Sequence, residues 1–146
     1  MTSMLEGKVV VVTGGASGIG RGIALSALRH GAKAIVIGDL AEEPREGGDT
    51  TQALIEAQGG KAVFLRTDVT SPRDLDALVA AAEPFGGVDL MVCNAGIALA
   101  EDGPDLSPEL FRKLISVNQE GALQSAQAAI AAMKKRGTGG SGVMIS

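Results

Sequence analysis

Hydrophobic residues in this chain follow two patterns that alternate along the sequence. Short unbroken apolar runs, the first of which is Val9 to Val12, are typical of strands buried on both faces of a parallel sheet. Between these runs, apolar residues recur every three or four positions, as in helices that pack on one face. One such stripe consists of Leu75, Leu78, Val79 and Ala82. The chain is therefore expected to alternate between strands and helices.

Glycine, proline and helix-capping residues mark the ends of these elements. The pattern predicts strands at residues 8–13, 34–38, 62–66, 88–93 and from 143 onward. It predicts helices at residues 18–30 and 50–58, from residue 72, and from residue 107 to about 136. Ser71, Pro72 and Asp74 form a capping box at the third helix. Residues 41–49 are expected to be a loop, and residues 137–142 a turn.

Strict alternation of strands and helices defines the fold class. It predicts an α/β fold with a doubly wound parallel sheet of about five strands, helices on both faces, and right-handed crossovers. We expect residues 1–146 to form a single domain. In such sheets, ligands bind beyond the carboxyl ends of the strands, where the strand order reverses. Candidate site residues are therefore sought at the ends of the predicted strands.

A glycine-rich turn follows the first strand and opens the first helix. Gly14, Gly18 and Gly20 are spaced as G-x-x-x-G-x-G. Gly14 allows a sharp turn, and the missing Cβ atoms of Gly18 and Gly20 allow a pyrophosphate and the neighbouring strand to approach. A helix that begins here presents free N–H groups and a partial positive charge to a phosphate. The alternative is a tight turn without a ligand, but the flanking strand and helix favour dinucleotide binding.

An acidic residue ends the second predicted strand. Asp39 lies 19 residues after Gly20, where a carboxylate can accept hydrogen bonds from an adenosine ribose and repel a 2′-phosphate. Leu40 follows it, and no arginine or lysine lies between Gly14 and Gly20. These residues favour NAD over NADP as the cofactor, although a solvated loop aspartate is the simpler alternative.

The third and fourth strands also end in candidate residues. Asp68 could hold the adenine amino group and Val69 could pack on its ring, but an ordinary turn before Ser71 explains them equally well. Asn94, with Ala95 and Gly96 after it, could tie neighbouring loops together through its amide, and the small residues leave room for a ribose and a nicotinamide. Cys93 is expected to be a small buried residue rather than a nucleophile.

The long fourth helix carries Asn118. Its apolar neighbours suggest that this amide lies on an inward face, where a buried polar group needs a partner. The inward face consists of Leu110, Leu114, Ile115 and Ala122. Asn118 could simply bond a nearby carbonyl, or it could order a catalytic water.

Composition limits the classes of function. A net charge of −4 and a pI near 5.0 argue against nucleic acid as a partner. One cysteine fits a reducing compartment. No segment is apolar enough for a signal core or a membrane span, so a cytoplasmic protein is expected, and we predict no metal site. The only histidine, His30, is expected at the far end of the first helix.

Together these residues resemble the short-chain dehydrogenase/reductase family over residues 8–146, in order and approximate spacing. The matching motifs are Thr13-Gly14-Gly15-Ala16-Ser17-Gly18-Ile19-Gly20, Asp39, Asp68-Val69, Asn94-Ala95-Gly96 and Val117-Asn118 with Gly121. One departure is Cys93, where the family more often has asparagine.

The resemblance implies particular roles for these positions. The pyrophosphate and adjoining ribose would be held by Gly14, Ser17, Gly18, Ile19 and Gly20. Asp39 would select NAD, and Asp68 and Val69 would form the adenine pocket. The nicotinamide half would be lined by Asn94, Ala95, Gly96 and Val117. Asn118 would match the asparagine of the family's Asn-Ser-Tyr-Lys catalytic group.

The resemblance also implies an oxidoreductase that transfers hydride between a secondary alcohol or ketone and NAD(H). The chain contains no tyrosine, and it ends where the family's catalytic serine is expected. We therefore expect the cofactor-binding part of such an enzyme, inactive alone and a little over half of its length. The alternatives are a stand-alone non-catalytic module, or a fragment that binds nothing.

The resemblance further implies association of copies. Family members pair their fourth and fifth helices across a dimer interface. Here the fifth strand would be an unpaired sheet edge, and the fourth helix would keep an uncovered apolar side. That side consists of Leu123, Ala126, Ile130 and Met133. We expect a homo-oligomer through this helix.

Overall fold

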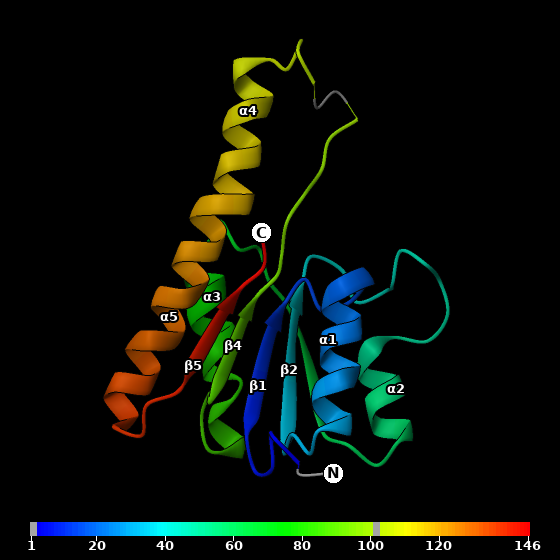
Figure 1. Cartoon of the computed structure of the whole chain (residues 1–146), viewed down its shortest axis with the longest axis vertical. Helices are drawn as coiled ribbons and strands as arrows, with labels where there is room; N and C mark the ends of the chain where they lie inside the picture. Colours follow the sequence, from blue (N-terminus) through cyan, green and yellow to red (C-terminus); the bar gives the residue numbers. More distant parts are fainter. Residues whose placement is uncertain (1–2, 101–102) are drawn as a thin grey trace.

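A computed structural model describes residues 3–100 and 103–146 as a five-stranded sheet with helices on both faces (Figure 1). The strands are β1 (Val9–Thr13), β2 (Ala34–Asp39), β3 (Ala62–Arg66), β4 (Leu90–Cys93) and β5 (Ser141–Met144). The α-helices are α1 (Gly18–Arg29), α2 (Thr51–Ala57), α3 (Pro72–Ala80), α4 (Pro108–Ile115) and α5 (Gly121–Arg136). A 3-10 turn, η1 (Glu83–Phe85), and a π-helical turn, η2 (Ser116–Glu120), complete the described elements.

The strands pair in the order β3-β2-β1-β4-β5, and every pairing is parallel. The predicted fold class is therefore confirmed. The chain moves outward from β1 to β3, then returns to the other side of β1 for β4 and β5. The strand order thus reverses between β1 and β4, where a ligand site is expected.

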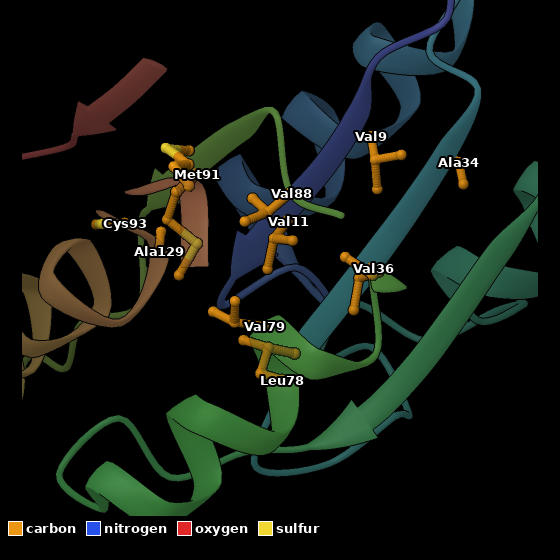
Figure 2. Packing of buried hydrophobic residues seen from close by; sticks show 12 residues of the cluster. Val9, Val11, Ala34, Val36, Leu78, Val79, Val88, Met91, Cys93 and Ala129 are labelled. Carbon is orange, nitrogen blue, oxygen red and sulfur yellow. The ribbon is translucent and has the colours of Figure 1, made fainter. Parts of the chain in front are cut away.

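The valine run of β1 serves both faces of the sheet. Val9 and Val11 pack towards α3 and α5, whereas Val10 and Val12 pack towards α1 and α2. All four are essentially buried, which explains why the run shows no polar alternation. Figure 2 shows Val11 beside Val36, Leu78 and Val79, between the sheet and α3.

The ion pair of Asp89 and Arg136 lies at the amino-terminal end of β1. Asp89 Oδ2 accepts a hydrogen bond of 2.8 Å from the backbone N–H of Val9. Asp89 Oδ1 accepts one of 2.9 Å from Arg136 at the end of α5. The Asp89 carboxylate therefore joins β1, the start of β4 and α5.

The predicted elements differ from the structure by more than one residue in three places. The fourth helix is interrupted by η2, whose wider π-helical turn leaves the apolar spacing almost unchanged and so gives no signal in the sequence. β5 begins at Ser141 rather than residue 143, because its backbone pairing with β4 needs no apolar side chain. β4 begins at Leu90 rather than residue 88.

The capping box of α3 is only half formed. Ser71 Oγ accepts from the N–H of Asp74 at 3.2 Å, as predicted. The Asp74 carboxylate, however, accepts from the N–H of Asp68 at 3.0 Å instead of returning to Ser71. Asp74 therefore fixes the loop after β3 as well as the helix end.

The apolar side predicted to be uncovered on the fourth helix lies in α5, and only part of it is exposed. Leu123 and Ile130 are exposed, at 53% and 48%, as expected of an uncovered side. Met133 is buried in the core beside Ala129, and Ala126 is partly buried against the same cluster. The helix is rotated so that two of the four expected residues face inward. β5 lies at the edge of the described sheet, as predicted.

Candidate functional site

The carboxyl ends of β1 and β4 lie side by side at the strand reversal. Thr13 and Cys93 are register partners, so the segments that follow them start from the same edge of the sheet. Gly14 turns one segment towards α1, while Asn94 leads the other towards α4. Figure 1 shows α4 extending beyond this edge of the sheet.

The glycine turn has the conformation that its residues suggest. Gly14 and Gly18 have positive φ angles of 68° and 54°, which residues with a Cβ rarely adopt. A Cβ on Gly20 would overlap the carbonyl oxygen of Gly14 and lie 2.5 Å from Asn94 Nδ2. A Cβ on Gly18 would meet nothing within 4 Å. Gly20 therefore allows the helix to pack on the turn, whereas Gly18 faces open space.

Hydrogen bonds join the glycine turn to the segment after β4. The buried Thr13 Oγ1 accepts from the N–H groups of Asn94 and Ala95 at 3.0 and 3.1 Å. Asn94 Nδ2 donates to the carbonyls of Thr13 and Gly14, at 3.2 Å each. The expectation that the Asn94 amide ties neighbouring loops together is confirmed.

Two adjoining cavities open at this edge of the sheet. The larger, of about 510 Å³, lies beyond β2 and β3 and includes Asp39, Asp68 and Val117 in its wall. The smaller, of about 270 Å³, lies over the start of α1. Both are lined by Gly14, Arg45 and Gly96. Most of the predicted site residues line one or both of these cavities: Gly14, Ser17, Gly18, Ile19, Asp39, Leu40, Asp68, Val69, Asn94, Gly96 and Val117.

Gly20, Ala95 and Asn118 do not line either cavity. Gly20 and Ala95 lie against Gly14 and support the wall from behind. Ile19 is 68% exposed and lines the smaller cavity. An exposed isoleucine at the start of α1 is available to cover a ligand.

Asp39 joins the end of β2 to the glycine turn. Its Oδ2 accepts from the N–H of Ala16 at 3.1 Å, and its Oδ1 accepts from the N–H of Leu40 at 2.8 Å. A carboxylate has about four lone-pair sites, so each oxygen retains the capacity to accept a further hydrogen bond. The carboxylate is thereby oriented beside the larger cavity.

Val69 lines the larger cavity but is mostly buried. Its side chain is only 6% exposed and lies against Gly121 at the start of α5, where a Cβ on the glycine would come within 2.6 Å of Val69 Cγ2. Little of this side chain is available to pack on a ring. Gly121 instead permits the close approach of α5 to the loop after β3.

Asp68 forms a local turn with Thr70. Its Oδ1 accepts from both the N–H and the hydroxyl of Thr70, at 2.9 and 2.7 Å. These bonds, the hydroxyl bond first, lower the pKa of the Asp68 carboxyl below its ordinary value. The group is therefore ionised at neutral pH at the edge of the larger cavity.

Replacing Thr70 with valine is expected to raise the pKa of Asp68 towards its ordinary value, because the hydroxyl donor is lost. A lowered folded-state pKa stabilises the fold at pH values above the unfolded-state pKa, and this contribution disappears as the pH falls through the folded-state pKa. The variant should lose less stability on acidification than the wild type. Carbon-13 NMR titration of the Asp68 carboxyl measures the shift; an unchanged pKa would contradict this assignment.

The predicted inward position of Asn118 was wrong. Asn118 is exposed, and none of the α4 residues is buried, because α4 and η2 extend past the sheet. Its Oδ1 accepts from the N–H of Ile97 at 2.7 Å, and its Nδ2 donates to the carbonyl of Ile97 at 2.8 Å. The simpler reading, an amide bonded to nearby backbone, describes this contact. Asn118 thus holds the segment after Gly96 against η2.

Sequence reasoning missed three residues around the glycine turn. The buried Thr51 at the start of α2 donates from its hydroxyl to the carbonyl of Gly15 at 2.8 Å. Arg45 and Glu46, in the loop before α2, contact Ser17 and Gly18. Each contact spans 28 or more positions in the chain, so spacing within one helix or strand gives no signal of it.

The other reactive side chains lie away from solvent or away from the cavities. Cys93 is buried, and burial raises the pKa of its thiol to about 11, which keeps the thiol protonated at neutral pH. His30 follows the last residue of α1, at the opposite end of the helix from the glycine turn. Among residues 3–100 and 103–146 no group of three or more metal-ligating side chains is found. In the same part of the chain, no helix has the length and hydropathy to span a bilayer.

The fold and site together define a class of protein. The family model described as short chain dehydrogenase matches residues 8–146. The chain therefore belongs to the short-chain dehydrogenase family, and the resemblance noted from its motifs is confirmed.

Individual relatives agree with this membership. The chain is 39% identical over 144 residues to an L-rhamnose 1-dehydrogenase (NAD(P)(+)) of Sphingomonas sp. (strain SKA58), covering 98% of this chain and 56% of that protein. It is 41% identical over 140 residues to a 2,5-dichloro-2,5-cyclohexadiene-1,4-diol dehydrogenase of Sphingobium indicum, covering 95% and 54%.

A solved structure also superimposes closely. A short-chain type dehydrogenase/reductase from Mycobacterium marinum matches with a TM-score of 0.86 and 31% identity, covering 97% of this chain and 55% of the other. The chain spans about half the length of the relatives that it matches.

Proposed function

We propose that residues 1–146 are one dinucleotide-binding domain of an oxidoreductase that transfers hydride between NAD(H) and a secondary alcohol or its ketone. The observation that carries the proposal is the glycine turn held at the strand reversal, with Asp39 hydrogen-bonded to it beside the two adjoining cavities. The positive end of α1 suits a diphosphate, and the retained lone pairs of Asp39 suit a ribose diol. The residues present therefore fit a dinucleotide.

The chemistry assigned to each residue follows from these contacts. When bound, the nicotinamide ring supplies a carbon that accepts or donates hydride. Gly14, Ser17, Gly18, Ile19 and Gly20 are proposed to hold the diphosphate, and Asp68 and Val69 to border the adenine. Asn94, Ala95, Gly96 and Val117 are proposed to border the nicotinamide half.

Asn118 is proposed as the catalytic asparagine of the family pattern, by way of its position on η2 and its two hydrogen bonds to Ile97. No tyrosine occurs among these 146 residues to serve as general acid and base. A second candidate is a module that binds the dinucleotide without catalysis. Alcohol oxidation by the purified 146-residue chain, lost in Asn118→Ala, would exclude that second candidate.

The proposed preference for NAD depends on Asp39, because its negative charge repels a 2′-phosphate. Arg45 lines both cavities and would favour NADP instead, because a guanidinium attracts the 2′-phosphate. Substrate class is proposed from the relatives alone, which oxidise a sugar and a cyclic diol by their names. A ring carbon that bears both a hydroxyl and a hydrogen is the shared chemistry.

Calorimetric titration with NAD and NADP tests this assignment. Asp39→Ala is expected to weaken NAD binding roughly 10- to 100-fold through loss of charge-assisted hydrogen bonds, and to improve the relative affinity for NADP. Asp49→Ala, which removes the same charge from an exposed position before α2, should leave the ratio of the two affinities unchanged. If Asp39→Ala alters neither the NAD affinity nor the NADP affinity, the cofactor assignment is wrong.

We also propose association of two copies along α5, because Leu123 and Ile130 are exposed there. No nucleic-acid or membrane partner is proposed, and the location is proposed to be cytoplasmic.

A further inference from the structure

The loop between β2 and α2 folds back over the glycine turn. The N–H of Arg45 donates to Ser17 Oγ at 2.8 Å, and Glu46 Oε1 accepts from the N–H of Gly18 at 3.0 Å. Arg21 in α1 donates to the carbonyl of Asp49 at 2.8 Å. Three contacts, all from residues 45–49 of this loop, therefore fasten it to the start of α1.

The Glu46 carboxylate occupies a position suited to an anion. Gly18 is the first residue of α1, which has 12 residues and carries no acidic side chain of its own in the first turn. Its N–H is among the unpaired donors that give this helix end a partial positive charge. Arg21 Nε lies 3.8 Å from Glu46 Oε1 and adds a second positive charge. Glu46 thus supplies the acidic group that the helix itself lacks.

Backbone hydrogen bonds favour the ionised form of the Glu46 carboxyl. Backbone N–H groups, first that of Glu46 itself and then that of Gly18, lower the pKa of Glu46 below its ordinary value. At neutral pH an ionised carboxylate therefore faces the N–H of Gly18. The Glu46 side chain remains 46% exposed, so it can leave this position without unfolding any helix or strand.

We propose that the Glu46 carboxylate is an internal competitor for the diphosphate site, and that a dinucleotide must displace it from Gly18 in order to bind. The inference rests on the proposed dinucleotide function and adds a residue that sets its affinity. One N–H carries one proton, so Gly18 cannot donate a full hydrogen bond to Glu46 and to a phosphate oxygen at once. Two anions at the same helix end also repel each other. Glu46 lines the smaller cavity, so its displacement also widens the space over the turn.

Calorimetric titration of the 146-residue chain with NAD tests the competition. Glu46→Ala is expected to bind NAD about tenfold more tightly than the wild type, because no charge-assisted hydrogen bond has to be broken first. Glu43→Ala is the matched control: it removes the same charge from an exposed residue of the same loop. Its affinity should stay within about twofold of the wild type. Equal affinities for the two variants, or weaker binding by Glu46→Ala, would overturn the inference.

A second readout needs no cofactor. In nitrogen-15 NMR spectra of the ligand-free chain, the Gly18 amide should shift as Glu46 is protonated, and should stop responding in that pH range in Glu46→Ala. A Gly18 amide that ignores Glu46 overturns the inference even if NAD binds, and leaves the proposed function intact. A responsive Gly18 amide in a chain that, as wild type and as Glu46→Ala, binds no NAD at millimolar concentration overturns both.

Discussion

Gly20→Ala is expected to lower the free energy of unfolding by about 3 kcal/mol and to eliminate NAD binding. The new Cβ would overlap the carbonyl oxygen of Gly14 and press on Asn94 Nδ2, and the backbone oxygen cannot rotate away as a side chain would. Relief requires α1 to move away from the glycine turn. That movement separates the helix end from the edge of the sheet, so stability and binding are lost together. Urea unfolding and calorimetric titration measure the two effects.

Gly22→Ala is the matched control, since it makes the same change two residues further along α1. A Cβ on Gly22 would meet nothing within 4 Å. Alanine is the better helix former, so this variant should gain about 0.5–1 kcal/mol and bind NAD as the wild type does. Similar stabilities for the two variants would show that the close packing of Gly20 on the turn is not required.

Thr13→Val is expected to destabilise the chain by about 3 kcal/mol, although valine has nearly the same shape as threonine. The Thr13 hydroxyl oxygen accepts from the N–H groups of Asn94 and Ala95, and valine leaves both donors without this partner. The change also removes a longer bond of 3.4 Å from the hydroxyl to the carbonyl of Val92. Amide hydrogen exchange at Asn94 and Ala95 should accelerate, in parallel with a lower urea midpoint.

Thr70→Val, the same substitution at a second threonine, is the control. Thr70 is exposed, and its hydroxyl bonds only to the nearby Asp68 carboxylate among the described contacts. At neutral pH, Thr70→Val should cost less than about 1 kcal/mol. Equal losses for the two valine variants would mean that Thr13 does not brace the segment after β4.

The fold was predictable because each strand and helix has its own local signal. β1 could be recognised from four consecutive valines, and α3 from a stripe of apolar residues that are all buried in the structure. The strand order was not predicted, because topology rules limit the possible orders without choosing one. The break at η2 was not predictable, because a single wider helical turn changes the apolar spacing too little to be noticed.

Some residues of the candidate site could likewise be predicted from the sequence, and others could not. Gly14 follows β1, Gly18 begins α1 and Asp39 ends β2, so their positions near the sheet edge could be inferred from spacing alone. Arg45, Glu46 and Thr51 reach the glycine turn only because a loop folds back across the start of α1. Asn118 was misplaced for a different reason: the residues around it are apolar, but α4 and η2 extend beyond the sheet that would bury them.

The burial of β1 on both faces has a consequence for strand alignment. A slip of β1 by one residue would exchange its two faces, yet each face would still present valine to the core. Hydrophobic burial alone therefore discriminates weakly between the correct alignment and its neighbours. Polar contacts at the two ends of the strand make the distinction: Asp89 fixes the N–H of Val9, and the hydroxyl of Thr13 fixes the N–H of Asn94. In this sheet, buried hydrophobic residues stabilise the strands, and two hydrogen-bonded side chains determine the register of β1.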